Sequence, residues 1–202
     1  MSFNVEIFIN EAELELCKSN LLLDRKQIMI EHELLINDWN ETLKNIKKPI
    51  KFLIVGEATV SYSNYFYNLK ATKTSFLNPA DFGCQNKTDL IRCFNSNGIL
   101  VFDLYPLPLP TFIYDNVKFD CTNPNYCAEL NNYYDSVKSL IDDETKIVLR
   151  YKKLEKRCEW SIFLNHIDKA NYKHDSIASQ NMGASRKQIQ TSFNGILPFS
   201  NC

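Results

Sequence analysis

The sequence has no long apolar run, no signal-like start and no excess of basic residues over its 202 positions. Because no apolar run approaches the length that spans a bilayer, we expect neither a transmembrane helix nor a membrane partner. The start, Met-Ser-Phe-Asn-Val-Glu, lacks a basic region followed by an apolar stretch, so no secretory signal is predicted. Internal repeats and low-complexity tracts are also absent, and one domain over 1–202 is expected.

Cysteine pairs with familiar metal-binding spacing are missing too. The seven cysteines, at positions 17, 84, 93, 121, 127, 158 and 202, include no Cys-x-x-Cys pair. Their odd number excludes a complete disulfide framework within one chain. We therefore expect free thiols in a reducing cytoplasm, and we predict neither a metal nor a cofactor.

The formal net charge of −1 lacks the basic footprint that DNA-binding domains usually show. Basic residues do cluster locally, at Lys70 with Lys73, along 150–157, and at Arg186 with Lys187. Each cluster is equally typical of a solvated surface. A protein that grips a few phosphates needs only a local patch, so the charge weakens a nucleic-acid function without excluding it.

What the sequence does contain is an alternation of helix and strand signals, with 45% hydrophobic residues to fill a core. Apolar positions from Ile28 to Ile46 recur every three or four residues, which predicts a long amphipathic helix that Pro49 ends. A helix before it is expected to begin at Asn10, where Glu13 completes a capping box. Residues 1–49 are thus expected to form helices that pack on a sheet.

Residues 50–202 are expected to form the α/β core. Predicted strands are the apolar run ending at Gly56, then 99–102, 146–151 and 174–179. Predicted helices include one from Thr88 to Gly98, one around 130–140, one over 153–168, and a last one capped by Ser185. The alternation indicates a mostly parallel four-stranded sheet flanked by helices.

The loop after the first strand carries the most chemistry. Glu57 places a carboxylate directly after Gly56, and the aromatic segment Tyr65-Phe66-Tyr67-Asn68 follows. Ligands of α/β sheets bind at the carboxyl ends of strands, so a flat ring stacked beside an acid group fits this pattern. An ordinary first strand with aromatic residues in its core fits it equally well.

Three segments resemble motifs of the uracil-DNA glycosylase superfamily, in the family order and across residues 50 to 198. Gly56-Glu57-Ala58 with the aromatic segment is similar to the first motif of bacterial members that have a Gly-Glu-Ala loop. The stretch 98–106 resembles the second strand, which ends in a base-reading polar residue. The stretch 181–186 is similar in position to the loop that enters DNA. The resemblance implies a uracil-DNA-glycosylase-like fold and a DNA partner bearing a damaged or deaminated base.

The resemblance also implies a base pocket formed by Gly56, Ala58, Phe66, Tyr67 and Asp103, with Phe66 or Tyr67 stacking on the base. Uracil-specific relatives read the base edge with an asparagine where this chain has Asp103. An ionised carboxylate only accepts hydrogen bonds, so Asp103 suits an edge that presents donors, such as an amino group next to a ring N–H. Capping of a neighbouring backbone turn is an equal alternative for Asp103.

Glu57 and Asn181 are the candidate catalytic residues. Ala58 stands where the most active relatives have a water-activating aspartate, which leaves Glu57 to orient water or to favour a cationic sugar. Glu57 can equally accept hydrogen bonds from the N–H groups of its own loop. Relatives commonly have a histidine in the last motif, where the amide of Asn181 would donate to the developing base oxygen.

The candidate DNA contacts are Met182, Gly183, Ser185 and Arg186. Met182 is an apolar wedge for the space that a flipped base vacates, and the amides from Gly183 to Arg186 can hold a phosphate at a helix start. A glycine-containing loop before a capped helix is the alternative. The sequence thus predicts a DNA glycosylase; the alternatives are a catalytically silent nucleic-acid- or nucleotide-binding relative, and a small-nucleoside deoxyribosyltransferase with Glu57 as nucleophile.

Overall fold

The N-terminal region is helical, as expected. The computed structural model describes residues 3–18, 22–71, 77–109, 118–150, 152–169 and 175–176. Helix α1 spans Val5–Cys17 and α2 spans Arg25–Asn45. The predicted start at Asn10 is wrong, because the side chain of Asn4 accepts the N–H of Glu6 and begins the helix earlier.

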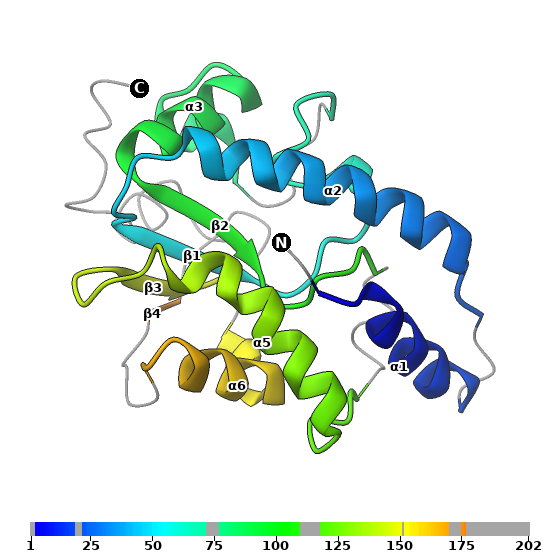
Figure 1. The fold of residues 1–202 in the computed structure, drawn as a ribbon. Coiled ribbons are helices and arrows are strands. Elements are labelled where there is room, and N and C mark those ends of the chain that lie inside the picture. The colour runs from blue at the N-terminus through cyan, green and yellow to red at the C-terminus, as the bar shows by residue number, and fades with distance from the viewer. Residues whose placement is uncertain are drawn as a thin grey trace.

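Three parallel strands form a small open sheet (Figure 1), namely β1 (Phe52–Gly56), β2 (Ile99–Asp103) and β3 (Lys146–Leu149). The two-residue β4 (Asp175–Ser176) pairs with β3, and the order is β2-β1-β3-β4. The α/β class and the parallel sheet flanked by helices are therefore confirmed. A full fourth strand over 174–179 and a glycosylase-like topology stay predictions.

The connecting helices begin and end at residues that satisfy their free backbone groups. Helix α3 (Lys87–Asn97) is capped by Asn86, whose side chain accepts the N–H of Asp89, and not by Thr88 as predicted. Gly98 ends it with a φ of 69°, a left-handed conformation that favours glycine. The helix predicted over 153–168 is divided into the 3₁₀ turn η3 (Lys152–Lys156) and α6 (Cys158–His166).

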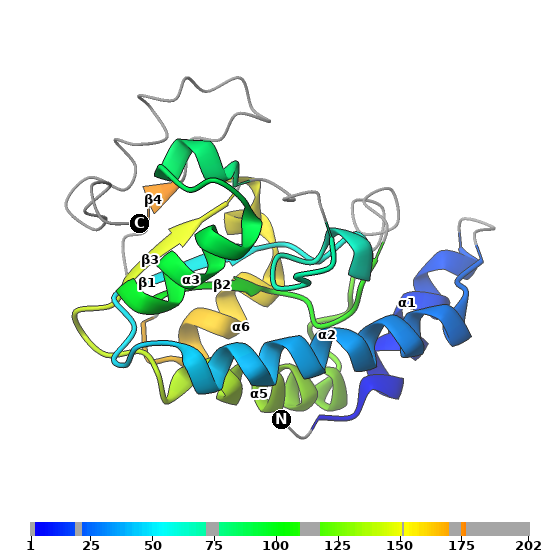
Figure 2. The same ribbon diagram turned by 90° about the horizontal axis from the view of Figure 1, so that it is seen from above.

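Helices cover both faces of the sheet (Figure 2), with α3 on one side and α2, α5 (Pro124–Lys138) and α6 on the other. Phe102 of β2 shows this packing. Its ring lies 5.7 Å from Trp39 of α2, 5.0 Å from Tyr133 of α5 and 5.7 Å from Phe163 of α6, measured between ring centroids. Because neighbouring residues of a strand point to opposite faces, Asp103 must project toward the other side, at the strand's carboxyl end.

The expectation of free thiols is wrong for three of the described cysteines, because Cys93, Cys121 and Cys158 are disulfide-bonded. Cys121 and Cys158 form a disulfide that closes a separation of 37 residues and ties the segment before α5 to the start of α6. The chain there is held further by Phe119, whose ring stacks on Tyr105 at 4.4 Å. Cys17, Cys84 and Cys127 are free thiols. Among the described residues, no helix has the length and apolar character to cross a bilayer.

Candidate functional site

The carboxyl ends of β1, β2 and β3 surround a small cavity of about 90 Å³. The loop after β1 forms one wall, the end of β2 forms the floor, and the residue after β3 completes the site. The lining residues are Ala58, Thr59, Val60, Asn64, Tyr65, Phe66, Val101, Asp103 and Arg150. Ala58, Phe66 and Asp103 are thus brought together as the sequence predicts for a base pocket.

Gly56 sets the position of the Asp103 side chain. The parallel register places Gly56 directly beside Asp103. A Cβ atom on Gly56 would lie 2.4 Å from Oδ1 of Asp103, so only a glycine leaves room for the carboxylate across the end of β1. The backbone of Asp103 is fixed as well, because the Tyr133 hydroxyl donates to its carbonyl oxygen at 2.7 Å.

The electrostatics of the site centre on the Asp103 carboxyl group. Burial raises its pKa to about 6, although the charge of Arg150 and a hydrogen bond from the Thr59 side chain lower it, and Glu57 adds a small further increase. Thr59 is itself buried. The carboxyl group is therefore ionised at neutral pH and becomes protonated under mildly acidic conditions.

A buried lysine holds the aromatic wall in place. Nζ of Lys87 donates to the carbonyl oxygens of Tyr65, at 2.8 Å, and Asn68, at 2.9 Å. Burial lowers the pKa of Lys87 to about 8. Sequence reasoning missed this residue, although a signal was present: Lys87 falls on the apolar stripe of α3 with Leu90 and Phe94.

Tyr67 has a different place from the one predicted. Among the described residues that line the cavity, Tyr67 is absent, whereas Tyr65 and Phe66 are present. The Tyr67 hydroxyl accepts the N–H of Val101 at 2.8 Å, which satisfies an outward-facing donor on the edge strand β2. Its ring packs near Trp39 in the core. Tyr67 therefore supports the wall from behind, and stacking on a ligand falls to Phe66 or Tyr65.

Helix α2 fixes the loop that carries this wall. The Glu31 carboxylate accepts the N–H of Tyr62 at 2.7 Å, and the Tyr62 hydroxyl donates to Asp38 at 2.8 Å. Burial, together with Asp38, raises the pKa of Tyr62 to about 12, so the hydroxyl keeps its proton and its role as donor. The N-terminal helices thus position the site without lining this cavity.

Of the two candidate catalytic residues, the structure describes Glu57 but not Asn181. An oxygen of Glu57 lies 2.8 Å from Nζ of Lys153, and Glu57 is not among the described residues that line the cavity. Asn181 lies outside the described residues, as do Met182, Gly183, Ser185 and Arg186. The roles of these five residues stay predictions.

No protein-family model, curated protein or solved structure matches this chain. The kinship with uracil-DNA glycosylases therefore stays an expectation that the sequence motifs carry. The structure shows how two of these motifs lie relative to each other. Two of the three motifs meet at one edge of the sheet, where Gly56 of the first contacts Asp103 of the second.

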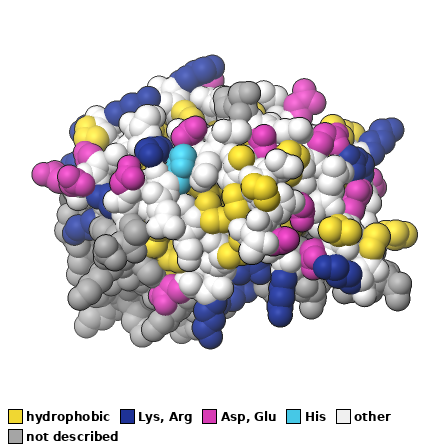
Figure 3. All heavy atoms as spheres, turned by 60° about the horizontal axis from the view of Figure 1, so that its bottom comes forward, with side chains coloured by type: hydrophobic (Ala, Val, Ile, Leu, Met, Phe, Trp, Pro, Cys, Tyr) yellow, Lys and Arg dark blue, Asp and Glu magenta, His cyan; other side chains and the backbone are white. Residues whose placement is uncertain are grey.

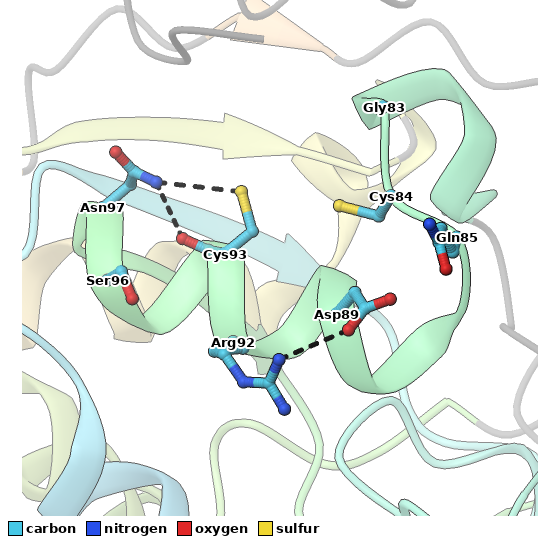
Figure 4. Close-up of a pocket in the computed structure, with 8 residues that line it drawn as sticks. All are labelled: Gly83, Cys84, Gln85, Asp89, Arg92, Cys93, Ser96 and Asn97. Atoms are coloured by element: carbon cyan, nitrogen blue, oxygen red, sulfur yellow. Dashed lines mark hydrogen bonds and ion pairs between the residues drawn. The ribbon is translucent and has the colours of Figure 1, made fainter. Parts of the chain in front are cut away.

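A larger cavity, of about 430 Å³, lies beside α3 and is less suited to chemistry (Figure 4). Asp89 and Arg92 on its wall pair with each other at 3.4 Å, and Asn97 donates to the carbonyl oxygen of Cys93 at 2.8 Å. Its charged groups therefore satisfy one another along a single helix surface. The cavity at the strand ends differs because the loop after β1, strand β2 and the residue after β3 all contribute to its lining.

The side chains that line the smaller cavity include an acceptor, a donor and an aromatic ring. Asp103 only accepts hydrogen bonds when ionised, Arg150 only donates them, and Phe66 offers a ring face. Sequence reasoning noted Arg150 only as part of a basic cluster, but the residue directly after β3 lies at the same sheet edge as Asp103. Such an arrangement can orient one planar polar ring.

Proposed function

We propose that this chain is a uracil-DNA-glycosylase-like protein whose strand-end cavity binds a nucleobase flipped out of DNA. The observation that carries the proposal is the convergence of Asp103, Arg150 and Phe66 on one cavity. A flipped base must be read along its polar edge and held by stacking. Asp103 and Arg150 supply the polar groups, and Phe66 or Tyr65 supplies the ring face.

The size of the cavity favours a base over a free nucleoside. Pockets for drug-sized ligands occupy roughly 300 to 1,000 Å³. The strand-end cavity, at about 90 Å³, has room for one ring and not for an enclosed sugar as well. A base that enters from a polymer leaves its sugar outside, at the mouth. The deoxyribosyltransferase alternative is therefore disfavoured, also because its nucleophile, Glu57, is paired with Lys153.

The distribution of charge limits where a DNA backbone can lie. On the face in Figure 3, basic and acidic side chains of the described residues both occur, with several basic ones along its lower edge. Basic residues also gather beside the site, where Arg150 lines the cavity and η3 contributes Lys153 and Lys156. Phosphates next to a flipped base would lie against this segment and, according to the sequence, near Arg186.

A second candidate function is base binding without cleavage. Glu57 is the acid nearest the first motif, yet its ion pair with Lys153 satisfies one of its oxygens. An active glycosylase would need Glu57 to leave Lys153, or Asn181 to act on the base without it. A protein that only captures a flipped base needs neither.

The test is a set of duplex and single-stranded oligonucleotides, each with one modified or deaminated base. Binding is measured by fluorescence anisotropy, and abasic sites are measured by alkaline strand cleavage. Asp103→Asn is compared with Glu144→Gln, because Glu144 is an exposed acid near the opposite ends of the strands. We expect the first change to alter base preference and the second to change nothing.

Each outcome decides between the candidates. Abasic sites that require Glu57, as tested with Glu57→Gln, would establish a glycosylase. Base-dependent binding without abasic sites would establish the non-cleaving protein. If no base is preferred in any oligonucleotide, or if Asp103→Asn leaves the preference unchanged, the proposed pocket is wrong. Met182→Ala and Arg186→Ala extend the test: the first should weaken duplex binding more than single-strand binding, and the second should weaken both and reduce the salt dependence.

A further inference from the structure

Each charged group in the cavity acts either as a hydrogen-bond acceptor or as a donor, and the two kinds are supplied by different residues. The Asp103 carboxylate offers two acceptor oxygens, and the Thr59 side chain lies beside it as a possible partner for one of them. Arg150 lines the same cavity and carries donors only. Phe66 and Tyr65 add aromatic side chains to the lining. A ring that satisfies all of these groups must present one acceptor beside two donors along a single edge.

Few ring edges meet this requirement. In guanine, a carbonyl oxygen, a ring N–H and an exocyclic amino group follow one another along one edge. Isocytosine in its N3–H form carries the same three groups on a single ring. Uracil has a carbonyl on each side of its N–H, so its second carbonyl would face the carboxylate and repel it. The common form of cytosine has no ring N–H on this edge, and adenine has no carbonyl group.

We propose that the cavity selects a 2-amino-4-oxopyrimidine edge, the edge of guanine-type bases, through paired hydrogen bonds to Asp103 and a hydrogen bond from Arg150. This inference rests on the proposed base-binding function and specifies its substrate class. The cavity of about 90 Å³ holds the six-membered ring. When that edge enters first, the sugar-bearing nitrogen lies at the opposite end of the base, near the mouth, where the polymer must stay.

The experiment places isocytosine, 4-pyrimidinone or uracil at one position of the same single-stranded oligonucleotide, each joined to the sugar through its C5 atom so that N3 can keep its hydrogen. The three rings share a carbonyl and an N–H, and they differ in whether an amino group, a hydrogen or a second carbonyl comes next. Dissociation constants are measured at pH 8 by calorimetry. We expect isocytosine to bind roughly tenfold or more tightly than either of the others, since a hydrogen bond to a charged group is at stake.

Asp103→Asn should remove this preference and move it toward uracil, because the amide group then offers a donor beside its acceptor. Arg150→Gln should weaken all three rings, because each presents a carbonyl to that residue. Equal binding of the three rings by the wild-type protein, or preference for uracil, would overturn the guanine-type inference while leaving base binding intact. Failure of every ring to bind better than an oligonucleotide without a base would instead refute the proposed function itself.

Discussion

Substitution of Gly56 by alanine should reduce ligand affinity much more than it reduces the stability of the fold. The new Cβ would lie 2.4 Å from Oδ1 of Asp103, whereas ordinary contacts of this kind begin at 3.4 Å. The carboxylate must therefore move by roughly 1 Å, which exceeds the tolerance of a hydrogen bond. We expect base affinity to fall about 10- to 100-fold, which corresponds to roughly 1.5–3 kcal/mol for a charge-assisted hydrogen bond.

Stability should change less than affinity. The atom that the new methyl group meets is the far end of a side chain, so the strands need not separate, and we expect a loss of about 1 kcal/mol or less. Gly98→Ala is the matched control. At its φ of 69° an alanine costs roughly 1–2 kcal/mol, but Gly98 lies at the start of β2, away from the cavity.

Two measurements on each variant decide the matter, namely the free energy of unfolding from urea denaturation and the dissociation constant for the best-bound oligonucleotide. Gly56→Ala should lose affinity and keep most of its stability, and Gly98→Ala should show the reverse. If Gly56→Ala binds as tightly as the wild type, the Asp103 carboxylate does not read the ligand, and the reasoning for the site is wrong.

Three further expectations concern pH, the aromatic wall and the disulfide. Base affinity should fall about tenfold per pH unit below pH 6, because protonation of Asp103, whose pKa is raised to about 6, removes an acceptor. The raised pKa values of Tyr65, Tyr67 and Tyr133 keep these groups neutral, so Glu57→Gln is the control for the other nearby carboxylate. The free energy of unfolding of the free protein should change with pH in the opposite direction. Because the pKa of Asp103 is raised in the folded state, its contribution to stability is largest below about pH 4 and is lost as the pH rises through 6. In urea titrations, Asp103→Asn should flatten this dependence on pH. Lys87→Met should lower the free energy of unfolding by roughly 2–3 kcal/mol, since it removes the donor of two carbonyl groups, while exposed Lys51→Met should change it by less than about 0.5 kcal/mol. Cys121→Ser with Cys158→Ser should cost about 4 kcal/mol from the chain entropy of a 37-residue separation, and equal urea midpoints for the oxidised and reduced wild type would contradict a stabilising bond.

Local sequence patterns determined the elements of this protein. The apolar run before Gly56 and the alternation with helices indicated a parallel α/β sheet, and Gly98 marked the end of α3. These features depend on the conformational preferences and side-chain periodicity of neighbouring residues, which can be read directly from the chain. Helix starts were less certain because several Asn and Thr residues compete for one cap, as at Asn4 and Asn86.

The tertiary structure decided which groups share the site. The pairing of β1 with β2 and with β3 brings Asp103 and Arg150 to one cavity. Tyr67 lies outside this cavity, where its hydroxyl accepts the N–H of Val101 in β2. Lys87 and the Cys121–Cys158 bond likewise join segments that lie far apart in the sequence. Local patterns do not specify these contacts, because they follow from strand order and register, which the packing of the whole chain selects.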